Sequence, residues 1–319
     1  MTSAMKRGRH GVPRMSEKTL CAWVMLVFAI VPCDKAWSDE QAPREYCGIN
    51  IPPDEATGSV PLPEGDVFCP LIADPKAVYS YIAYVRGTSS SPLGTNLGSV
   101  GIGDRFGLFR WGGPRPGEGF QISMEGGVFA QFDLNTPSDD LINADYLVAL
   151  PMTFRRDGVS VRLRLYHQSS HLGDEFVLRS RIPRENFSFQ SVEGILSFDR
   201  GPLRLYAGGE DLFGANPGNV ETWLLHGGVE FRQRASVLRL GQFASLRLVA
   251  GGDVKAVEDL NWQPAWSAVA GIEVGSPHEG LHASRRWSLL AHYYNGPSPY
   301  GQFFRSGVEY YGVGLHFAL

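Results

Sequence analysis

The sequence predicts an all-β protein, a transmembrane antiparallel β-barrel of about 12 strands that follows a Pro-rich N-terminal segment. Three observations predict this fold. The chain begins with an export signal, no later stretch is apolar for long enough to form a helical span, and short segments that alternate apolar and polar residues recur to the C-terminus. Thirty-eight glycines, 12% aromatic residues and only 19% charged residues are also typical of a barrel.

Residues 1–38 have the three parts of a signal peptide. A basic region is followed by an apolar run at 20–31, and Ala36-Trp37-Ser38 offers small residues at the cleavage spacing, so we expect the mature chain to start at Asp39. The apolar run is shorter than the about 20 residues that span a bilayer. Two alternatives stay open: translation from Met15, and lipoprotein processing at Cys33, which the preceding proline disfavours.

Charge and cysteine content restrict the partners and the compartment. Residues 1–38 carry six basic and two acidic residues, so their removal changes the net charge from −4 to about −8. This acidic balance argues against nucleic acid as a partner. Cys47 and Cys69 remain in the mature chain, and in an oxidising compartment we favour a disulfide between them over two free thiols.

Residues 39–77 form a Pro-rich pre-barrel segment without periodicity. Prolines cannot donate backbone hydrogen bonds to a sheet, so this segment is not expected to supply strands of the wall. It could lie in the periplasm or fold into the mouth of the barrel, and both possibilities stay open.

The barrel is predicted over 78–319. Alternation places one face of each strand against lipid and the other against the lumen. The final strand shows this clearly, because Val313, Leu315 and Phe317 share one face, and it resembles the C-terminal signature of outer-membrane proteins except that Leu319 replaces Phe. That resemblance implies recognition by the barrel-assembly machinery. Candidate strands lie near 78–87, 97–111, 118–134, 142–156, 159–169, 187–200, 202–210, 221–234, 243–255, 262–275, 284–295 and 307–319.

Connection lengths predict the orientation. Tight turns at 155–158 and 199–202 fall on the periplasmic side if both termini lie there. Longer connections near 167–186, 208–221, 253–261 and 295–306 are then extracellular. We therefore expect a protein of the Gram-negative outer membrane, surrounded by outer-membrane lipids.

Charged residues follow the inward parity of the strands. They would pair across a small lumen and fill it, which predicts a packed interior or a narrow channel and disfavours a wide porin. These residues are Glu125, Arg162, Arg164, Arg204, Glu230, Arg232, Arg247 and Glu273.

One segment carries residues that could perform chemistry. His167 and Ser169 are two apart on the lipid-facing side of a strand, at the predicted extracellular rim. Such an imidazole can activate a serine hydroxyl when a third group orients it, and Asp174 or Glu175 could be that group if the loop folds back. Backbone amides near Gly173 could stabilise an oxyanion. The simpler interpretation is that these polar residues only hydrate the rim.

Other candidates are weaker. Asp253, Glu258 and Asp259 could bind Ca²⁺ from an extracellular loop, although a solvated acidic loop is the favoured interpretation. The remaining histidines lack metal-ligand spacing, so we expect no metal site and no cofactor. The aromatic residues of the last third are typical of interfacial girdles; they are Trp262, Trp266, Trp287, Tyr293 and Tyr294.

Four stretches resemble an uncharacterised outer-membrane family, domain of unknown function 1207. They are Cys69–Pro75, Gly126–Asp133, Asp140–Tyr146 and Tyr166–Glu175. The family has no established activity, so the resemblance implies the fold and the location only.

A shorter resemblance concerns mechanism. Outer-membrane phospholipase A and the lipid A deacylase use a His-x-Ser pair on a barrel wall, and His167 and Ser169 match its positions. Ser170-His171 departs from the Asn-Gly that follows the pair in the phospholipase. The resemblance implies an alternative function, a lipid esterase. The main expectation is a non-enzymatic barrel with a structural or narrow-channel role, and a soluble or secreted β protein is the third possibility.

Overall fold

The computed structural model describes residues 58–318, apart from 89–93, 116, 183–185, 219, 235, 242–243 and 276–285. The chain divides into two compact units, Met1–Pro43 and Arg44–Leu319, and all described residues belong to the second unit. The predicted signal peptide 1–38, Cys47 and His282, one of the histidines that lack metal-ligand spacing, therefore lie outside the described residues. Within them, no helix is both long and apolar enough to cross a membrane.

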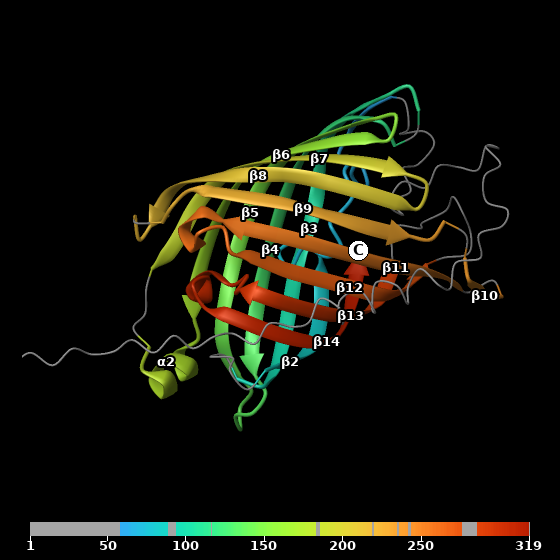
Figure 1. Cartoon of the computed structure of the whole chain (residues 1–319). Helices are drawn as coiled ribbons and strands as arrows, with labels where there is room; N and C mark the ends of the chain where they lie inside the picture. Colours follow the sequence, from blue (N-terminus) through green and yellow to red (C-terminus); the bar gives the residue numbers. More distant parts are fainter. Residues whose placement is uncertain are drawn as a thin grey trace, which may run out of the picture. The chain divides into compact units, whose positions relative to one another are not determined.

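Twelve antiparallel strands close into a barrel, as the sequence predicts (Figure 1). Each strand pairs with its neighbours in the ring, and closure comes from β2, which pairs with β14 on one edge and β3 on the other. The strands are β2 (Ser80–Gly87), β3 (Asn96–Gly112), β4 (Gly119–Asp133), β5 (Asp140–Arg156), β6 (Val159–Leu172), β7 (Phe187–Arg200), β8 (Leu203–Asn216), β9 (Trp223–Arg232), β11 (Ala244–Val257), β12 (Pro264–Gly275), β13 (Arg286–Pro297) and β14 (Gly307–Ala318).

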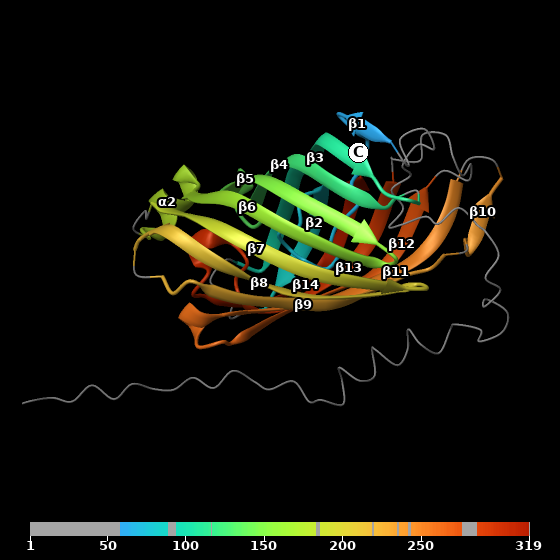
Figure 2. The same ribbon diagram turned by 90° about the horizontal axis from the view of Figure 1, so that it is seen from above.

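The two ends of the barrel differ. One end, here called the loop end, carries α2 (Asp174–Ser180) and the short 3-10 helices η1 (Glu258–Leu260) and η2 (Gly301–Phe303). The opposite turn end carries the tight turn at Asp157–Gly158 and two short strands, β1 (Ser59–Pro61) beside β3 and β10 (Leu238–Leu240) beside β11. Figures 1 and 2 show α2 and β10 at opposite ends.

Several strands are longer at the loop end than predicted, and the largest differences are in β6 and β8. β6 continues to Leu172 and β8 to Asn216, and the expected loop after β6 contains a helix. Leu172 and Phe176 are buried, so apolar packing at the mouth of the barrel orders this connection. Asp174 and Glu175 lie in the first turn of α2, where the helix dipole favours negative charge.

The faces of the strands are sorted as a membrane barrel requires. On β6, Leu163 and Leu165 are about half exposed, whereas Arg162 and Arg164 between them are buried. Exposed apolar side chains of this kind cover the outer face of the other strands as well; examples are Ile82, Ile102, Phe106, Val148, Val192, Leu205, Leu225, Leu289 and Val313. A soluble barrel would direct these side chains inward, so the outer face fits a lipid environment.

Tryptophans lie at both ends of this apolar surface. Trp266 and Trp223 are exposed toward the loop end, and Trp111 and Trp287 toward the turn end. This is the arrangement of interfacial girdles. The prediction for Tyr294 was wrong: its side chain is buried in the lumen, because Tyr294 has the inward parity of β13.

The described part of the Pro-rich segment enters the barrel. We call residues 62–79 the plug. Phe68 and Leu71 are fully buried against Ile195 and Tyr206, which point inward from β7 and β8. Further along, Ala73 packs with inward apolar side chains of β11, β12 and β13; these are Val249, Val269 and Leu290. Of the two locations that the sequence left open, the structure therefore supports folding into the barrel. Cys69 of the plug is disulfide-bonded.

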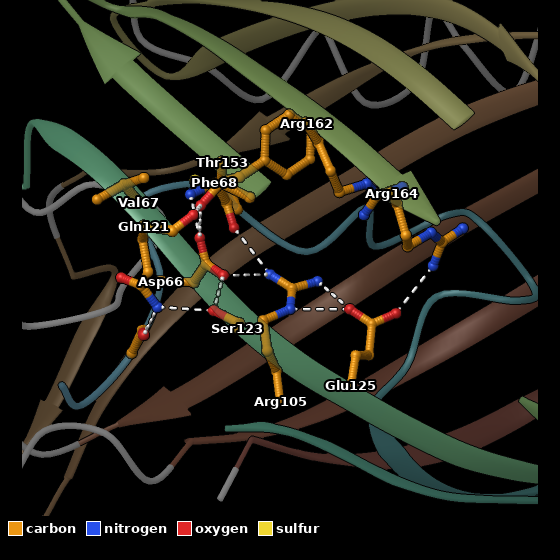
Figure 3. A network of polar contacts seen from close by, with 12 residues as sticks. Asp66, Val67, Phe68, Arg105, Gln121, Ser123, Glu125, Thr153, Arg162 and Arg164 are labelled. Atoms are coloured by element: carbon orange, nitrogen blue, oxygen red, sulfur yellow. Dashed lines mark hydrogen bonds and ion pairs between the residues drawn. The ribbon is translucent and has the colours of Figure 1, made fainter. Parts of the chain in front are cut away.

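Charged side chains tie the plug to the wall (Figure 3). Thr153 donates a hydrogen bond of 2.8 Å to Asp66, and Arg105 lies 3.2 Å from the other carboxylate oxygen of Asp66. Arg105 and Arg164 then share Glu125, at 2.7 and 2.8 Å. The ring of Phe68 is held between two guanidinium groups, those of Arg162 at 4.9 Å and Arg204 at 4.7 Å.

The predicted pairing of inward charges is confirmed beyond this network. Arg162 and Arg164 both contact Glu193, Arg204 contacts Glu230, and Arg232 contacts Glu273. Buried charges are tolerated only when paired, so this lumen is a packed ionic interior and not a wide aqueous pore.

Candidate functional site

The outer face of β6 near the loop end carries the candidate site. His167 and Ser169 are partly exposed and His171 is exposed, whereas Tyr166, Gln168 and Ser170 are buried. The parity predicted from the sequence is therefore correct. A strand places side chains two residues apart on one side, so His167 and Ser169 are neighbours along the outer wall.

The side chain that orients His167 comes from the adjacent strand. Gln190 of β7 is directly opposite His167 in the register, and its amide nitrogen lies 3.1 Å from His167 Nδ1. As placed, the amide donates to Nδ1. The amide turned by 180° would instead present its oxygen, which would accept a hydrogen bond from an Nδ1–H group and leave Nε2 as a base.

Gly214 of β8 makes room for Gln190. Its φ of +59° lies in the left-handed region, and a Cβ atom there would collide with Oε1 of Gln190. Glycine adopts this conformation without steric cost, so the β7–β8 pairing fixes the position of the Gln190 amide.

Ser169 lies between two outward side chains of the neighbouring strands. Tyr146 of β5 and Ser188 of β7 face it in the register, and the ring of Tyr146 contacts His171 edge to face with centroids 5.7 Å apart. Among the described residues, Ser169 and His167 are not hydrogen-bonded to each other. Transfer of the Ser169 proton would need a side-chain rotation, and catalytic hydrogen bonds are often open in enzymes without substrate.

The hydrogen-bond partner of His167 is Gln190, and the two predicted carboxylates lie beyond the end of β6. Asp174 and Glu175 begin α2, and this helix is anchored over the mouth of the barrel. The ring of Phe176 packs against Phe303 of η2 with centroids 5.9 Å apart, and Arg179 lies 2.9 Å from Asp133 at the end of β4. The peptide N–H of Gly173 donates to the carbonyl of Ile142, so it is not available as an oxyanion donor.

On the inner face of β6, buried side chains join β5, β6 and η2 at the loop end. Ser170 donates a hydrogen bond to Asp145, and the backbone N–H groups of Gly301 and Gln302 donate to Asp145 and Ser170 at 3.0 and 3.1 Å. Lys76 of the plug lies 2.5 Å from Asp145. β5–β6 pairing places Asp145 opposite Ser170, so two of the stretches singled out in the sequence meet here.

The expected acidic loop at 253–261 is not one cluster. β11 continues to Val257, so Asp253 points into the lumen, where Tyr206 donates to it at 2.5 Å and His226 Nε2 lies 2.6 Å away. Asp259, in contrast, lies in η1 and pairs with Arg305 at 3.0 Å. A Ca²⁺ site built from these carboxylates together is therefore ruled out by their separation on the two sides of the strand end.

The spacing of residues in the sequence also did not predict that several carboxylates surround His226. Ligand-type atoms of His226, Asp74 and Asp253 lie within 4.8 Å of one another, and so do those of His226, Glu193 and Glu210. Each of these carboxylates already has a partner: Lys255 pairs with Asp74, two arginines pair with Glu193, and tyrosine hydroxyls donate to Asp253 and Glu210. Both groups are therefore explained as parts of the ionic interior.

Comparison with known proteins identifies the family. The model of the family described as a protein of unknown function, DUF1207, matches residues 41–319. The chain belongs to this family. No curated protein matches it.

Solved structures share the fold. Outer membrane phospholipase A from Escherichia coli aligns with a TM-score of 0.51 and 13% identity, over 75% of this chain and 89% of the phospholipase. An active-site mutant of that enzyme at pH 6.1, in which alanine replaces an asparagine, aligns with a TM-score of 0.50 and 14% identity, over 76% and 92% of the two chains. At this identity the likeness establishes a barrel resembling an outer-membrane protein.

Proposed function

We propose that this DUF1207 protein is a sealed barrel of the Gram-negative outer membrane, with a structural and non-conducting role. One observation carries this proposal: the plug fills the lumen, with Phe68 fully buried between two arginines of the wall. The apolar outer face and the tryptophans at both ends support the location. In this proposal residues 1–38 are removed on export and the loop end faces the outside.

Conductance tests the sealed lumen. We expect the purified protein, refolded in detergent and added to planar bilayers in concentrated KCl, to give no stable current steps. A wide porin in the same bilayers is the control. Discrete, reproducible steps from the wild-type protein would contradict a sealed barrel and restore the narrow-channel interpretation.

A second function is favoured by the contact between His167 and Gln190. One of the similar phospholipase structures is an active-site mutant that lacks an asparagine, so a carboxamide belongs to that enzyme's site. Gln190 offers the same group at His167 Nδ1. We propose as the alternative that the outer wall hydrolyses acyl esters of surrounding lipids.

The chemistry would proceed in two steps. Ser169 Oγ attacks the acyl carbonyl while His167 Nε2 takes its proton, and the C–O bond to the lipid alcohol breaks as the imidazolium returns the proton to that alcohol. Water then attacks the acyl-serine ester by the same route and releases the fatty acid. This step requires the Gln190 amide in the turned orientation, in which its oxygen accepts a hydrogen bond from Nδ1–H and Nε2 is free to take the proton. The amide supplies no negative charge, so it would stabilise the imidazolium less than a carboxylate.

Fatty-acid release from mixed phospholipid–detergent micelles tests this alternative. We expect hydrolysis to be lost in His167→Ala and in Ser169→Ala, and to fall about 10²-fold or more in Gln190→Leu. His171→Ala, on the same face but outside the pair, is the matched control and should retain activity. Hydrolysis that persists in His167→Ala or in Ser169→Ala would contradict the esterase proposal. The sealed-barrel proposal would be unaffected by that result.

A further inference from the structure

A half-open cavity of about 140 Å³ lies inside the barrel at the loop end, above the plug. Asp74, Pro75 and Lys76 of the plug form its floor. Gln168 contributes to its wall from the inner face of β6, so the cavity and the His167 site lie on opposite sides of that strand. Mouths of β-barrels are common positions for ligand sites.

The walls of the cavity are mainly apolar. Side chains from β7, β8, β11, β12 and the segments around η2 supply them; the apolar members include Phe187, Phe189, Leu212, Val257, Ala265 and Phe304. Aromatic rings are prominent, and those of Phe187 and Phe304 are in contact with centroids 5.1 Å apart. Such walls favour an alkyl chain over a polar solute.

At the base of the cavity, each lysine side chain is more exposed than the aspartate with which it pairs. Lys255 Nζ lies 2.8 Å from Asp74, and the Lys255 side chain is 19% exposed while that of Asp74 is 1% exposed. Lys76 is more enclosed, because it contacts Asp145 and lies over the rings of Phe129 and Tyr300. Asp253 also lines the cavity, where it accepts a hydrogen bond of 2.5 Å from Tyr206 and lies 2.6 Å from His226 Nε2.

Two lysines and two aspartates line the cavity, and the side chain of Lys255 is the most exposed of the four, so Lys255 offers positive charge to a ligand there. An ammonium group has three N–H donors, and the bond to Asp74 uses one of them. A second anion in the cavity could accept from the others, and a low-dielectric wall would strengthen that contact. Ser267 and Ser298 add hydroxyl groups near the same region.

We propose that this cavity binds a single-chain alkyl carboxylate, with the carboxylate against Lys255 and the chain against the phenylalanines. The ligand enters from the loop end and rests on the plug. This site is independent of the His167 pair and of any hydrolysis there.

Binding of radiolabelled octanoate to the full-length protein in lipid nanodiscs tests the proposal, with empty nanodiscs subtracted. We expect saturable binding at one site, and at least tenfold weaker binding of octanol and octylamine in competition. Binding that never saturates, or octylamine that competes better than unlabelled octanoate, would overturn the proposal.

Three variants locate the site. Ala265→Phe fills the cavity and leaves every charge in place, whereas the double change Asp74→Asn with Lys255→Met removes the ion pair without leaving a lone charge. Both should weaken octanoate binding at least tenfold. Val254→Phe, on the same strand but the opposite face from Lys255, should bind as the wild type does. If the double variant does not refold, Ala265→Phe decides alone, and unchanged binding in it would contradict the site.

Discussion

Asp145 of β5 holds Lys76 of the plug at 2.5 Å, so one carboxylate of the wall fixes the segment that fills the lumen. The same carboxylate accepts hydrogen bonds from Ser170 and from the backbone of Gly301. The plug, β6 and η2 therefore all contact one side chain that is fully buried.

Replacement of Asp145 should destabilise the barrel strongly. Asp145→Ala leaves the Lys76 ammonium buried without its counter-charge, and we expect a loss of about 3–5 kcal/mol in unfolding free energy. Urea unfolding in detergent, followed by tryptophan fluorescence, measures it. The double variant with Lys76→Met should recover part of the loss, and a double variant no more stable than the single one would contradict the pairing.

Phe68 should be the most important apolar residue of the plug. Phe68→Ala removes a fully buried ring from between two arginines, and we expect a loss of about 3–5 kcal/mol in unfolding free energy. Leu62→Ala is the matched control, because Leu62 is exposed at the start of the plug. Equal stability of the two variants would show that the plug is not packed as described.

A charged side chain on the outer face should destabilise the barrel. Leu163 points outward between two inward arginines, and Leu163→Arg places a guanidinium on the apolar surface. We expect about 2–4 kcal/mol of destabilisation in bilayers, because arginine is costly at this depth of the membrane. Folding titrations in vesicles measure this change, with Leu163→Met as the control. A neutral effect of arginine would argue against lipid contact at this position.

Gly214 should influence the position of the His167 ring through Gln190. Gly214→Ala strains a residue at φ +59° and pushes against the Gln190 amide, so we expect about 1–2 kcal/mol of destabilisation and a displaced His167 ring. If the wall is an esterase, kcat should fall while KM changes little. Histidine NMR shifts of His167 that match those of the wild type would contradict this positioning role.

The sequence by itself determined the strands and their faces. Alternation in β6 or β14 is visible along the chain because the two sides of a barrel wall meet different solvents, and side chains two residues apart share a side. The inward placement of Arg162 and Glu125, and the outward placement of His167 and Ser169, followed from that parity alone.

Only the tertiary structure decided which residues meet. Gln190 lies 23 positions after His167, and the hydrogen bond between them depends on the β6–β7 register, for which the sequence offers no separate signal. Asp253 was expected in a loop because the end of β11 has no clear turn residue. The location of the plug depended on long-range packing of Phe68 with Ile195 and Tyr206, and a proline-rich stretch without periodicity carries no local information about such contacts.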